Sequence, residues 1–309
     1  MSGSWKVTLP CTRAEAEAID AADDLAIEAV LMTTEVEDDR TRWRLDAYVE
    51  AEPDAGFVAA LRALVPSTAA APVVERLDDA DWVTLSQAGL EPIAEGRFTV
   101  HTAAYPVAPP PGGRAFRIEA GQAFGTGHHA TTSGCLAMLD RLGGRGFARV
   151  IDVGTGTGLL AFAAAHLWPA AAVTATDIDA RAVEVTRENA AANGIEGVRL
   201  IVADGALAEA VTAGAPYDLV IANILAGPLV SMAPELVAIA GPGATIVLAG
   251  LLETQRAAVL AAFAGVGCVL AEADVRGDWT ILRLTAGAER YVPSTPFDPK
   301  GRDGWALDL

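Results

Sequence analysis

Three glycines and two aspartates in the middle of the chain have the residue types and spacing of a nucleoside-binding site. An apolar stretch leads into Gly154, Gly156 and Gly158, with Asp152 two residues before the first glycine, and the next apolar stretch ends at Asp177. In a strand–loop–helix–strand unit, glycines let the backbone approach a ligand, and an acid at the second strand's tip binds ribose hydroxyls. The pattern therefore predicts a nucleoside site.

The loop spacing distinguishes between two kinds of nucleoside ligand. Dinucleotide sites usually read G-x-G-x-x-G and rest a pyrophosphate on the helix N-terminus, whereas this loop reads G-x-G-x-G. Asp152 would repel a pyrophosphate, but it suits a ligand that carries an ammonium and a sulfonium group and no phosphate. The sequence thus favours S-adenosyl-L-methionine and a methyltransferase, with an NAD-dependent oxidoreductase as the alternative. We expect Gly154 to approach the methionine part, and Asp152 or loop carbonyls to bind its amino group.

Asp177 and two further aspartates are assigned from their place after predicted strands. Asp177 is expected to accept hydrogen bonds from both ribose hydroxyls. Asp179, two residues later, is expected to cap the following helix rather than to touch the ligand. Asp204 follows the third strand of the domain and lies beside Gly205. It either binds the adenine amino group or is a turn residue, and both interpretations stay open.

A glycine- and histidine-rich loop at 121–132 leads directly into a predicted helix. Backbone N–H groups at a helix N-terminus bind anions, so we expect this loop to face the carboxylate of the cofactor, with the Thr132 hydroxyl adding a bond. Other loop residues expected to contact the cofactor are Phe124, Gly125 and Thr126. A metal site at His128 and His129 is disfavoured, because adjacent side chains point apart and no cysteine or carboxylate lies at ligand spacing.

Asn223 ends an apolar stretch and is followed by an irregular apolar turn. Methyl transfer to nitrogen needs a neutral amine whose lone pair is aligned with the methyl–sulfur bond. An asparagine carbonyl at a strand tip can accept the amine's N–H bonds and aim it, and a lysine that loses its proton on entering the site needs no strong base. Asn223 is therefore the predicted amine-positioning residue; the alternative is a turn or cap. Trp279 either walls the substrate channel or lies in the core.

The elements that must hold these residues alternate along the second part of the chain. Strands are predicted near 149–153, 172–176, 198–202, 217–221, 244–249, 267–272 and 278–284. Helices are predicted around 131–142, 158–167, 180–193, 229–239 and 254–264. Such alternation implies a mostly parallel sheet covered on both faces. The last two strands are separated by too few residues for a parallel crossover and must pair antiparallel. This predicts an α/β fold, the seven-stranded, Rossmann-like sheet of class I methyltransferases.

Residues 1–78 predict a small α+β domain of order β-α-β-β-α-β, a ferredoxin-like arrangement. Thr12 with Glu15 and, later, Asp54 are the expected helix caps. Residues 79–96 are expected to form a helical connector, and residues 97–285 the methyltransferase domain, which opens with a hairpin over 98–118. The tail, 286–309, has no clear periodicity.

Composition restricts the function classes. With 309 residues, 52% of them apolar, the chain can bury a sizeable core, and no apolar stretch approaches the ~20 residues that span a bilayer. The N-terminus lacks signal-peptide features and the three cysteines are far apart, so a cytoplasmic protein with no membrane partner is expected. The net charge of −18, with 22 basic against 40 acidic residues, disfavours direct nucleic-acid binding. It either speeds encounter with a basic partner or only aids solubility. A monomer is the default expectation.

Several of these segments together resemble the PrmA family, the methyltransferases of large-subunit ribosomal protein 11. The resemblance covers roughly residues 1–285, and Trp82 also matches the family's connector. The segments that carry it are Phe124–Thr132, Asp152–Gly158, Asp177–Asp179, Asn223–Ala226 and Gly250–Gln255.

The resemblance implies AdoMet-dependent methylation of lysine side chains and of the N-terminal amine of that ribosomal protein. It implies cofactor contacts at Thr132, Gly154, Asp177 and Asn223, and a substrate-holding role for the N-terminal domain. A ribosomal protein free of RNA is basic, so the acidic residues at 35 and 37–39 (Glu35, Glu37, Asp38, Asp39) are expected to attract it. A methyltransferase of another protein or small molecule, and a non-catalytic binding protein with this fold, are the remaining alternatives.

Overall fold

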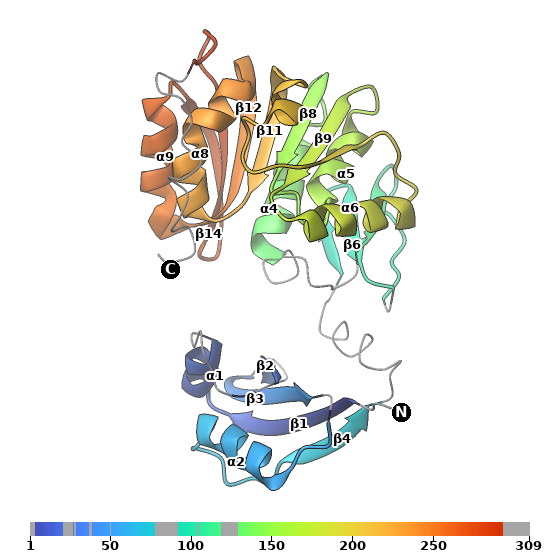
Figure 1. Cartoon of the computed structure of the whole chain (residues 1–309), viewed down its shortest axis with the longest axis vertical. Coiled ribbons are helices and arrows are strands. Elements are labelled where there is room, and N and C mark those ends of the chain that lie inside the picture. The colour runs from blue at the N-terminus through green and yellow to red at the C-terminus, as the bar shows by residue number, and fades with distance from the viewer. Residues whose placement is uncertain are drawn as a thin grey trace. The chain divides into compact units, whose positions relative to one another are not determined.

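The computed structural model of the chain describes residues 4–20, 27, 29–36, 39–49, 51–77, 92–103, 105–118 and 129–292. The chain divides into two compact units, residues 1–89 and 90–309, which are described separately (Figure 1). None of the described helices combines the length and the apolar character that crossing a membrane requires.

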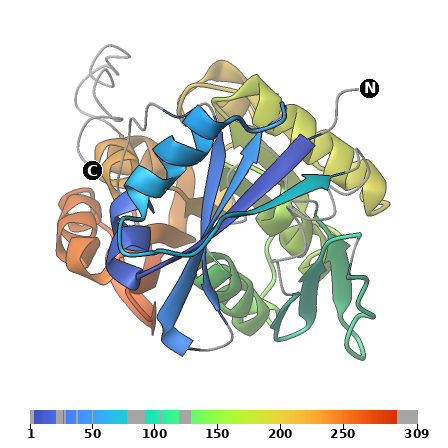
Figure 2. The ribbon, with the colours of Figure 1, turned by 90° about the horizontal axis from the view of Figure 1, so that it is seen from below.

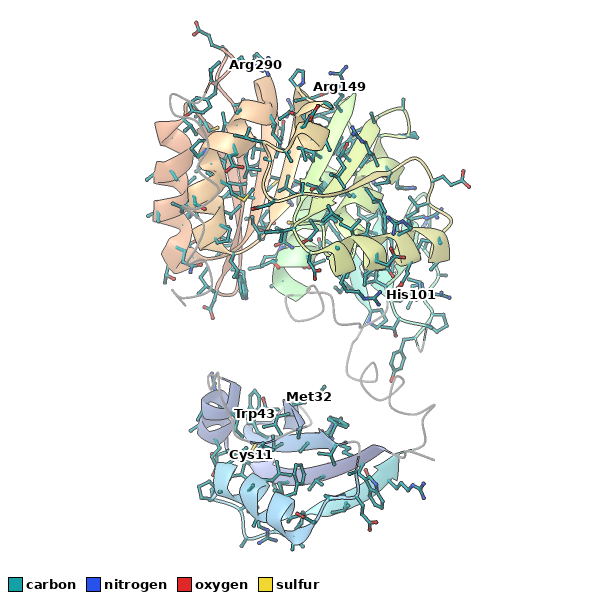
Figure 3. The ribbon with its side chains drawn as sticks, in the orientation of Figure 1. Cys11, Met32, Trp43, His101, Arg149 and Arg290 are labelled. Carbon is teal, nitrogen blue, oxygen red and sulfur yellow. The ribbon has the colours of Figure 1, made fainter. Side chains whose placement is uncertain are left out.

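The N-terminal unit is a four-stranded antiparallel sheet with two helices (Figures 1 and 2). Its elements are β1 (Ser4–Cys11), α1 (Arg13–Asp20), β2 (Val30–Val36), β3 (Asp39–Val49), α2 (Ala55–Leu64) and β4 (Val73–Leu77). The strand order β2-β3-β1-β4 confirms the predicted ferredoxin-like arrangement. Alternate strand residues such as Val7 and Leu45 face the helices and pack against Ile19 and Leu61. Cys11 and Trp43, labelled in Figure 3, belong to the same cluster or pack against it.

Both helix starts of this unit are capped as predicted. Thr12 and Glu15 form reciprocal bonds: the Thr12 backbone N–H donates to Glu15 Oε2 at 2.7 Å, and the Glu15 N–H donates to Thr12 Oγ1 at 3.3 Å. Asp54 Oδ1 accepts the backbone N–H of Phe57 at 2.7 Å. Glu15 also accepts the hydroxyl of Ser67 at 2.6 Å, which ties α1 to the turn after α2.

We expect Glu15→Gln to loosen α1. Burial alone would raise the pKa of Glu15, but bonds from Ser67 and Thr12 outweigh it and lower the pKa from 4.5 to about 2. The carboxylate therefore contributes stability above about pH 4.5 that is lost as pH falls toward 2. Hydrogen exchange of α1 amides at neutral pH should be faster in Glu15→Gln than in the wild type. Glu52→Gln removes an exposed carboxylate of the same unit and should change nothing; equal effects would contradict the prediction.

The C-terminal unit is built on a seven-stranded sheet of order β10-β9-β8-β11-β12-β14-β13. The strands are β8 (Arg149–Val153), β9 (Ala172–Asp177), β10 (Arg199–Val202), β11 (Tyr217–Asn223), β12 (Ala240–Leu252), β13 (Val269–Arg276) and β14 (Trp279–Thr285). The first five strands in the sheet order are parallel, and β14 runs antiparallel to β12 and to β13. The predicted class I methyltransferase sheet, with one reversed strand near its edge, is confirmed.

Helices cover both faces of this sheet (Figure 1). They are α4 (His129–Leu142), α5 (Leu159–Leu167), α6 (Ala180–Ala192), α7 (Glu209–Thr212), α8 (Ala226–Ile239) and α9 (Arg256–Gly265). Strand residues alternate between two cores: Val220 packs with α8 and α9, whereas Leu219 and Ile221 pack with α4 and α5. Burial on both faces explains why the central strands read as nearly continuous apolar runs.

A small three-stranded sheet corrects two predictions. It consists of β5 (Ile93–Glu95), β6 (Phe98–His101) and β7 (Arg114–Arg117). The expected hairpin over 98–118 is wrong, because β6 and β7 pair parallel; β6 instead forms a tight antiparallel pair with β5. The expected helical connector is wrong at 93–95, which is a strand, and its remainder, 79–91 with Trp82, lies outside the described residues.

Candidate active site

The predicted site residues gather at the carboxyl ends of parallel strands, the edge where open α/β sheets bind ligands. Asp177 ends β9 and is directly opposite Val202 at the end of β10. Asn223 ends β11 opposite Ala249 of β12. Arg149, labelled in Figure 3, is the first residue of β8 and lies at the opposite, amino end of this strand.

The glycine loop after β8 is held tightly against the end of β9. The backbone N–H groups of Gly154 and Thr155 both donate to the carbonyl oxygen of Thr176, at 2.8 and 3.0 Å. Gly154 has φ of 72°, and a Cβ there would lie 2.3 Å from Ile224 Cγ2. Only glycine fits both the left-handed backbone and the close approach of Ile224. The loop therefore offers bare backbone beside the strand that carries Asn223.

Asp177 fixes the middle of the same loop. Its Oδ2 accepts the backbone N–H of Gly156 at 3.0 Å, and its Oδ1 accepts the N–H of Asp179 at 3.0 Å. Each oxygen of a carboxylate can accept more than one hydrogen bond, so Asp177 retains capacity for ligand hydroxyls. Asp152, Gly154, Gly156 and Asp177 are thus brought together as the sequence predicted.

Asp152 is a buried carboxylate beneath the loop. Only 1% of its surface is exposed. Its Oδ2 accepts the Thr155 hydroxyl at 2.7 Å and the Ala161 N–H at 3.2 Å, whereas Oδ1 has no hydrogen-bond partner among the described residues. Burial raises the pKa of Asp152 to about 6; the bonds from Thr155 and Ala161 oppose this, and the charge of Asp177 adds to it. A buried, unpaired carboxylate oxygen is costly, which is expected where a cationic ligand group completes the site.

Asp179 and Asp204 occupy the loops that follow β9 and β10. Asp179 Oδ1 accepts the N–H of Arg181 at 2.8 Å, which confirms it as the cap of α6. Asp204 is exposed just after β10. The backbone of its loop is held from α8, because the Ala206 N–H donates to Oε2 of the buried Glu235 at 3.0 Å.

Two apolar residues at this edge were not predicted from the sequence. Ile178 follows Asp177 and is 62% exposed, and Val202, opposite Asp177, is 53% exposed. Exposed branched side chains beside the carboxylate of Asp177 form an apolar surface suited to a flat aromatic ring. The available signal for Ile178 was an apolar residue directly after the aspartate that ends a strand; Val202 is the last residue of an apolar strand and carried no such signal.

Asn223 and Ile224 form a rigid strand tip. The Ile224 N–H donates to the Ala249 carbonyl at 3.1 Å, and a Cβ on Gly250 would lie 2.3 Å from the Ile224 carbonyl oxygen. The turn after β11 is therefore packed against β12, with Asn223 half-buried at its start. Trp279, at the start of β14 opposite Leu252, is half-buried at the same edge of the sheet.

The start of α4 lies close to Asp152. Thr131 and Thr132 are buried in its first turn. Cys135, one turn later, is buried, and burial together with the charge of Asp152 raises the pKa of its thiol. Since residues three apart share a helix face, Thr132 lies on the same side of α4 as Cys135, whose thiol is close enough to Asp152 to be affected by its charge. Phe124, Gly125, Thr126 and His128 lie outside the described residues, as does the side chain of His129.

Comparisons with known proteins agree with this geometry. Residues 6–286 match the family described as ribosomal protein L11 methyltransferase (PrmA). A ribosomal protein L11 methyltransferase of Agrobacterium fabrum is 42% identical over 83% of this chain and 89% of its own length. One from a Caulobacter species is 42% identical over 88% of this chain and 94% of its own. A crystal structure of ribosomal protein L11 methylase from Lactobacillus delbrueckii subsp. bulgaricus superposes with a TM-score of 0.58 at 27% identity, covering 63% of this chain and 98% of that one.

Proposed function

The chain belongs to the PrmA family of ribosomal protein L11 methyltransferases, and from this premise we propose that it methylates amino groups of ribosomal protein L11. It is a methyltransferase whose cofactor is S-adenosylmethionine, and a nicotinamide-dependent oxidoreductase, the alternative kept open on the sequence, is set aside. The observation that carries the site assignment is the unpaired oxygen of buried Asp152 beneath a glycine loop that Asp177 holds.

The residues fit the methionine end of this cofactor. Asp152 Oδ1 is a buried acceptor without a partner in the described chain, and an ammonium group would satisfy it. Gly154 has no side chain and takes a left-handed backbone conformation that packs against Ile224, and we propose that the bare backbone of this loop lies against the methionine part of the ligand. Thr132, on the same side of α4 as Cys135, is proposed to donate its hydroxyl to the carboxylate. Phe124, Gly125 and Thr126 stay predicted contacts of the loop before α4.

The nucleoside end is assigned to the neighbouring strand tips. Asp177 is proposed to bind both ribose hydroxyls, with Gly156 held in place by the same carboxylate. Ile178 and Val202 would pack against the adenine ring, because both expose apolar surface beside Asp177. Asp204 is proposed to accept a hydrogen bond from the adenine amino group.

When bound, the cofactor supplies an electrophilic methyl group on a positively charged sulfur. The chain's own contribution is to orient the amine that attacks it. Asn223 is proposed to accept an N–H bond of the neutral amine and to aim its lone pair, aided by backbone carbonyls of the turn. The close packing of Ile224 against Gly154 and Gly250 keeps this turn at a fixed distance from the glycine loop. Removal of the amine from water on entering the site would favour its uncharged form, because the ammonium form loses solvation.

The raised pKa of Asp152 predicts pH-dependent cofactor binding. Only the ionised carboxylate pairs well with an ammonium group, and a pKa of about 6 leaves half of the ligand-free protein protonated near pH 6. The Kd of S-adenosylhomocysteine should therefore rise about tenfold from about pH 7 to about pH 5. Calorimetric titration at several pH values would measure it.

Asp152→Asn is the control for this prediction. It keeps an oxygen to accept the bonds from Thr155 and Ala161, but it cannot ionise. The variant should bind S-adenosylhomocysteine weakly and with a flat pH profile over this range. A profile as steep as that of the wild type would assign the titration to another group.

Charge supports an RNA-free ribosomal protein as substrate. Residues 1–78 contain 16 acidic and 7 basic residues, so the N-terminal unit attracts a basic protein. We propose that this unit holds the substrate and that residues 79–91 connect it to the methyltransferase unit, with the enzyme acting as a cytoplasmic monomer. Neutralising the four acidic residues at 35 and 37–39, whose side chains lie outside the described ones, should weaken capture at low salt; unchanged capture would contradict this role.

The decisive experiment supplies the protein with radiolabelled S-adenosylmethionine and purified ribosomal protein L11, either alone or bound to its ribosomal RNA fragment. We expect label on the protein alone, seen by mass spectrometry as added methyl groups on lysines and the N-terminal amine, and little label on the RNA complex. Label on a metabolite or on RNA, with none on the ribosomal protein, would overturn the substrate. The variant Asp177→Ala is the inactive control.

A further inference from the structure

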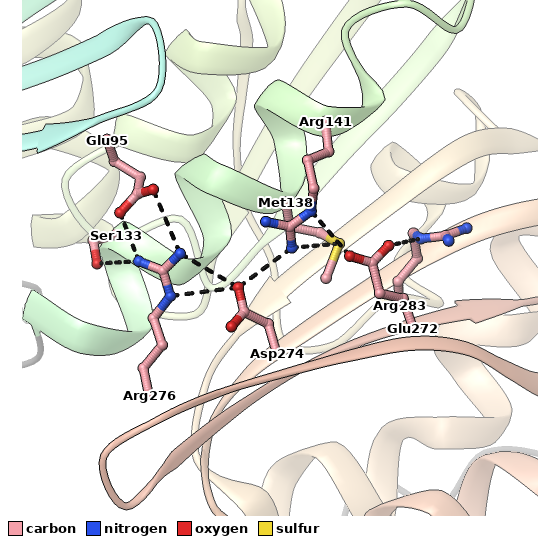
Figure 4. Close-up of polar contacts among 8 residues, drawn as sticks. All are labelled: Glu95, Ser133, Met138, Arg141, Glu272, Asp274, Arg276 and Arg283. Atoms are coloured by element: carbon pink, nitrogen blue, oxygen red, sulfur yellow. Dashed lines mark hydrogen bonds and ion pairs between the residues drawn. The ribbon is translucent and has the colours of Figure 1, made fainter.

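A chain of alternating charges runs along the face of β13 that α4 covers (Figure 4). Its members, in order, are Glu95, Arg276, Asp274, Arg141, Glu272 and Arg283. Each side chain is between 21% and 44% exposed. Ion pairs at such exposure each contribute at most about 1 kcal/mol to stability, so stability alone is a weak reason for the network.

Arg276 is the member that reaches the cofactor-binding side. Its Nη1 contacts Glu95 Oε2 at 2.6 Å and the Ser133 hydroxyl at 3.0 Å. Its Nη2 contacts Glu95 Oε1 at 3.4 Å and Asp274 Oδ2 at 3.3 Å. The planar guanidinium fixes all of these directions at once, so one side chain joins β5, β13 and the start of α4, as Figure 4 shows.

The position of Arg276 is unfavourable for the helix itself. The N-terminus of a helix carries partial positive charge and repels a cation, and Arg276 approaches α4 at that end, at Ser133. Arg141 is in the last turn of the same helix, where a cation is favoured. Two carboxylates, Glu95 and Asp274, offset the charge of Arg276 and hold it there.

The second turn of α4, which follows Thr132, is also packed closely against the sheet. A Cβ on Gly134 would lie 2.2 Å from Ile281 Cδ1 and 3.4 Å from Arg276 Cδ. This part of α4 therefore packs on β14 and on the aliphatic stem of Arg276, and the bond from Arg276 to Ser133 adds a directional contact. Ser133 is adjacent to Thr132, the proposed ligand of the cofactor's carboxylate.

We propose that Arg276 is a positioning residue for the cofactor: through Ser133 it holds the N-terminal part of α4 so that the neighbouring Thr132 faces the carboxylate of S-adenosylmethionine. The inference rests on the proposed function of this site. It gives the hairpin of β13 and β14 a role in cofactor binding in addition to its place at the edge of the sheet.

The test compares Arg276→Gln with Arg141→Gln in the full chain. Both variants remove an arginine from the same charged chain, but only the first loses the bond to Ser133 in the N-terminal part of α4. We expect Arg276→Gln to raise the Kd of S-adenosylhomocysteine about tenfold and the KM for S-adenosylmethionine likewise, with kcat at saturation within about twofold of wild type. Arg141→Gln should bind within about twofold of wild type. Arg276→Lys, which keeps the charge without the fork, should be intermediate.

Ser133→Ala removes the bond to Arg276 but keeps the charge of Arg276. It replaces Arg276→Gln in the test if that variant folds poorly. Because both substitutions break one contact, the double variant should bind no more weakly than Arg276→Gln alone. Three results would each overturn the inference. The first is a double variant that binds more weakly than Arg276→Gln alone, and the second is a Ser133→Ala variant that binds like the wild type. The third is an equal loss of binding in Arg276→Gln and Arg141→Gln. If the wild-type protein itself fails to bind S-adenosylhomocysteine, the result contradicts the proposed function rather than the role of Arg276.

Discussion

Asp177→Ala is expected to weaken the binding of S-adenosylhomocysteine by about 100-fold or more, because hydrogen bonds to a charged acceptor are worth about 1.5–3 kcal/mol each and two ribose hydroxyls lose theirs. The substitution also frees the N–H groups of Gly156 and Asp179, which now donate to the carboxylate at 3.0 Å each. The loop then keeps the backbone bonds of Gly154 and Thr155 to Thr176 but loses the bond that fixes Gly156, so the methionine end is affected together with the ribose. Isothermal titration of the purified variants measures the effect.

Asp179→Ala is the matched control for that loss. Asp179 is also an acid of the same turn, but its side chain caps α6 through Arg181. Removing the cap should lower the stability of the protein by about 1 kcal/mol and leave the Kd within a few-fold of wild type. If Asp179→Ala weakens binding as much as Asp177→Ala does, the ribose role of Asp177 is wrong and the whole turn acts as a unit.

Local spacing explains why so much of this site was predictable. The glycines, Asp152 and Asp177 are within one strand–loop–helix–strand unit, so their relative positions depend on short-range geometry that the sequence specifies. The Asp179 cap was predictable for the same reason. Periodicity likewise located all seven strands of the large sheet, with the ends of β12 and β13 off by a few residues.

Features that depend on distant pairing were not predictable. The stretch 98–118 contains the two expected strands, but periodicity does not report partners, and β6 pairs with β5 and parallel to β7. The strand β5 has only three residues, too few for a periodic signal. Arg276 and Glu95 are 181 positions apart, and the sequence around each residue gives no indication that the two pair. Ile178 and Val202 were missed because exposure is a property of the folded surface.

Asn223→Ala is expected to lower kcat about 100-fold, because an amine displaced by as little as about 1 Å loses the aligned attack on the methyl group. The KM for S-adenosylmethionine should rise by a smaller factor, since Asn223 is also a proposed cofactor contact. Asn223→Asp should fail as well for a different reason: a carboxylate stabilises the protonated amine, which has no lone pair to donate. Steady-state rates of methyl transfer to ribosomal protein L11, measured against both substrates, separate these effects.

Ile224→Val is the control in the same turn. It keeps the Cγ2 methyl group that packs against Gly154 and loses only the terminal carbon, so kcat should change by less than about threefold. Because the turn stays packed in that variant, a large loss of kcat confined to the Asn223 variants would reflect the side-chain amide rather than the backbone. Should Asn223→Ala instead keep the wild-type kcat and raise only the KM for the cofactor, Asn223 would be a binding residue alone, and the amine would be aimed by the backbone carbonyls of the turn.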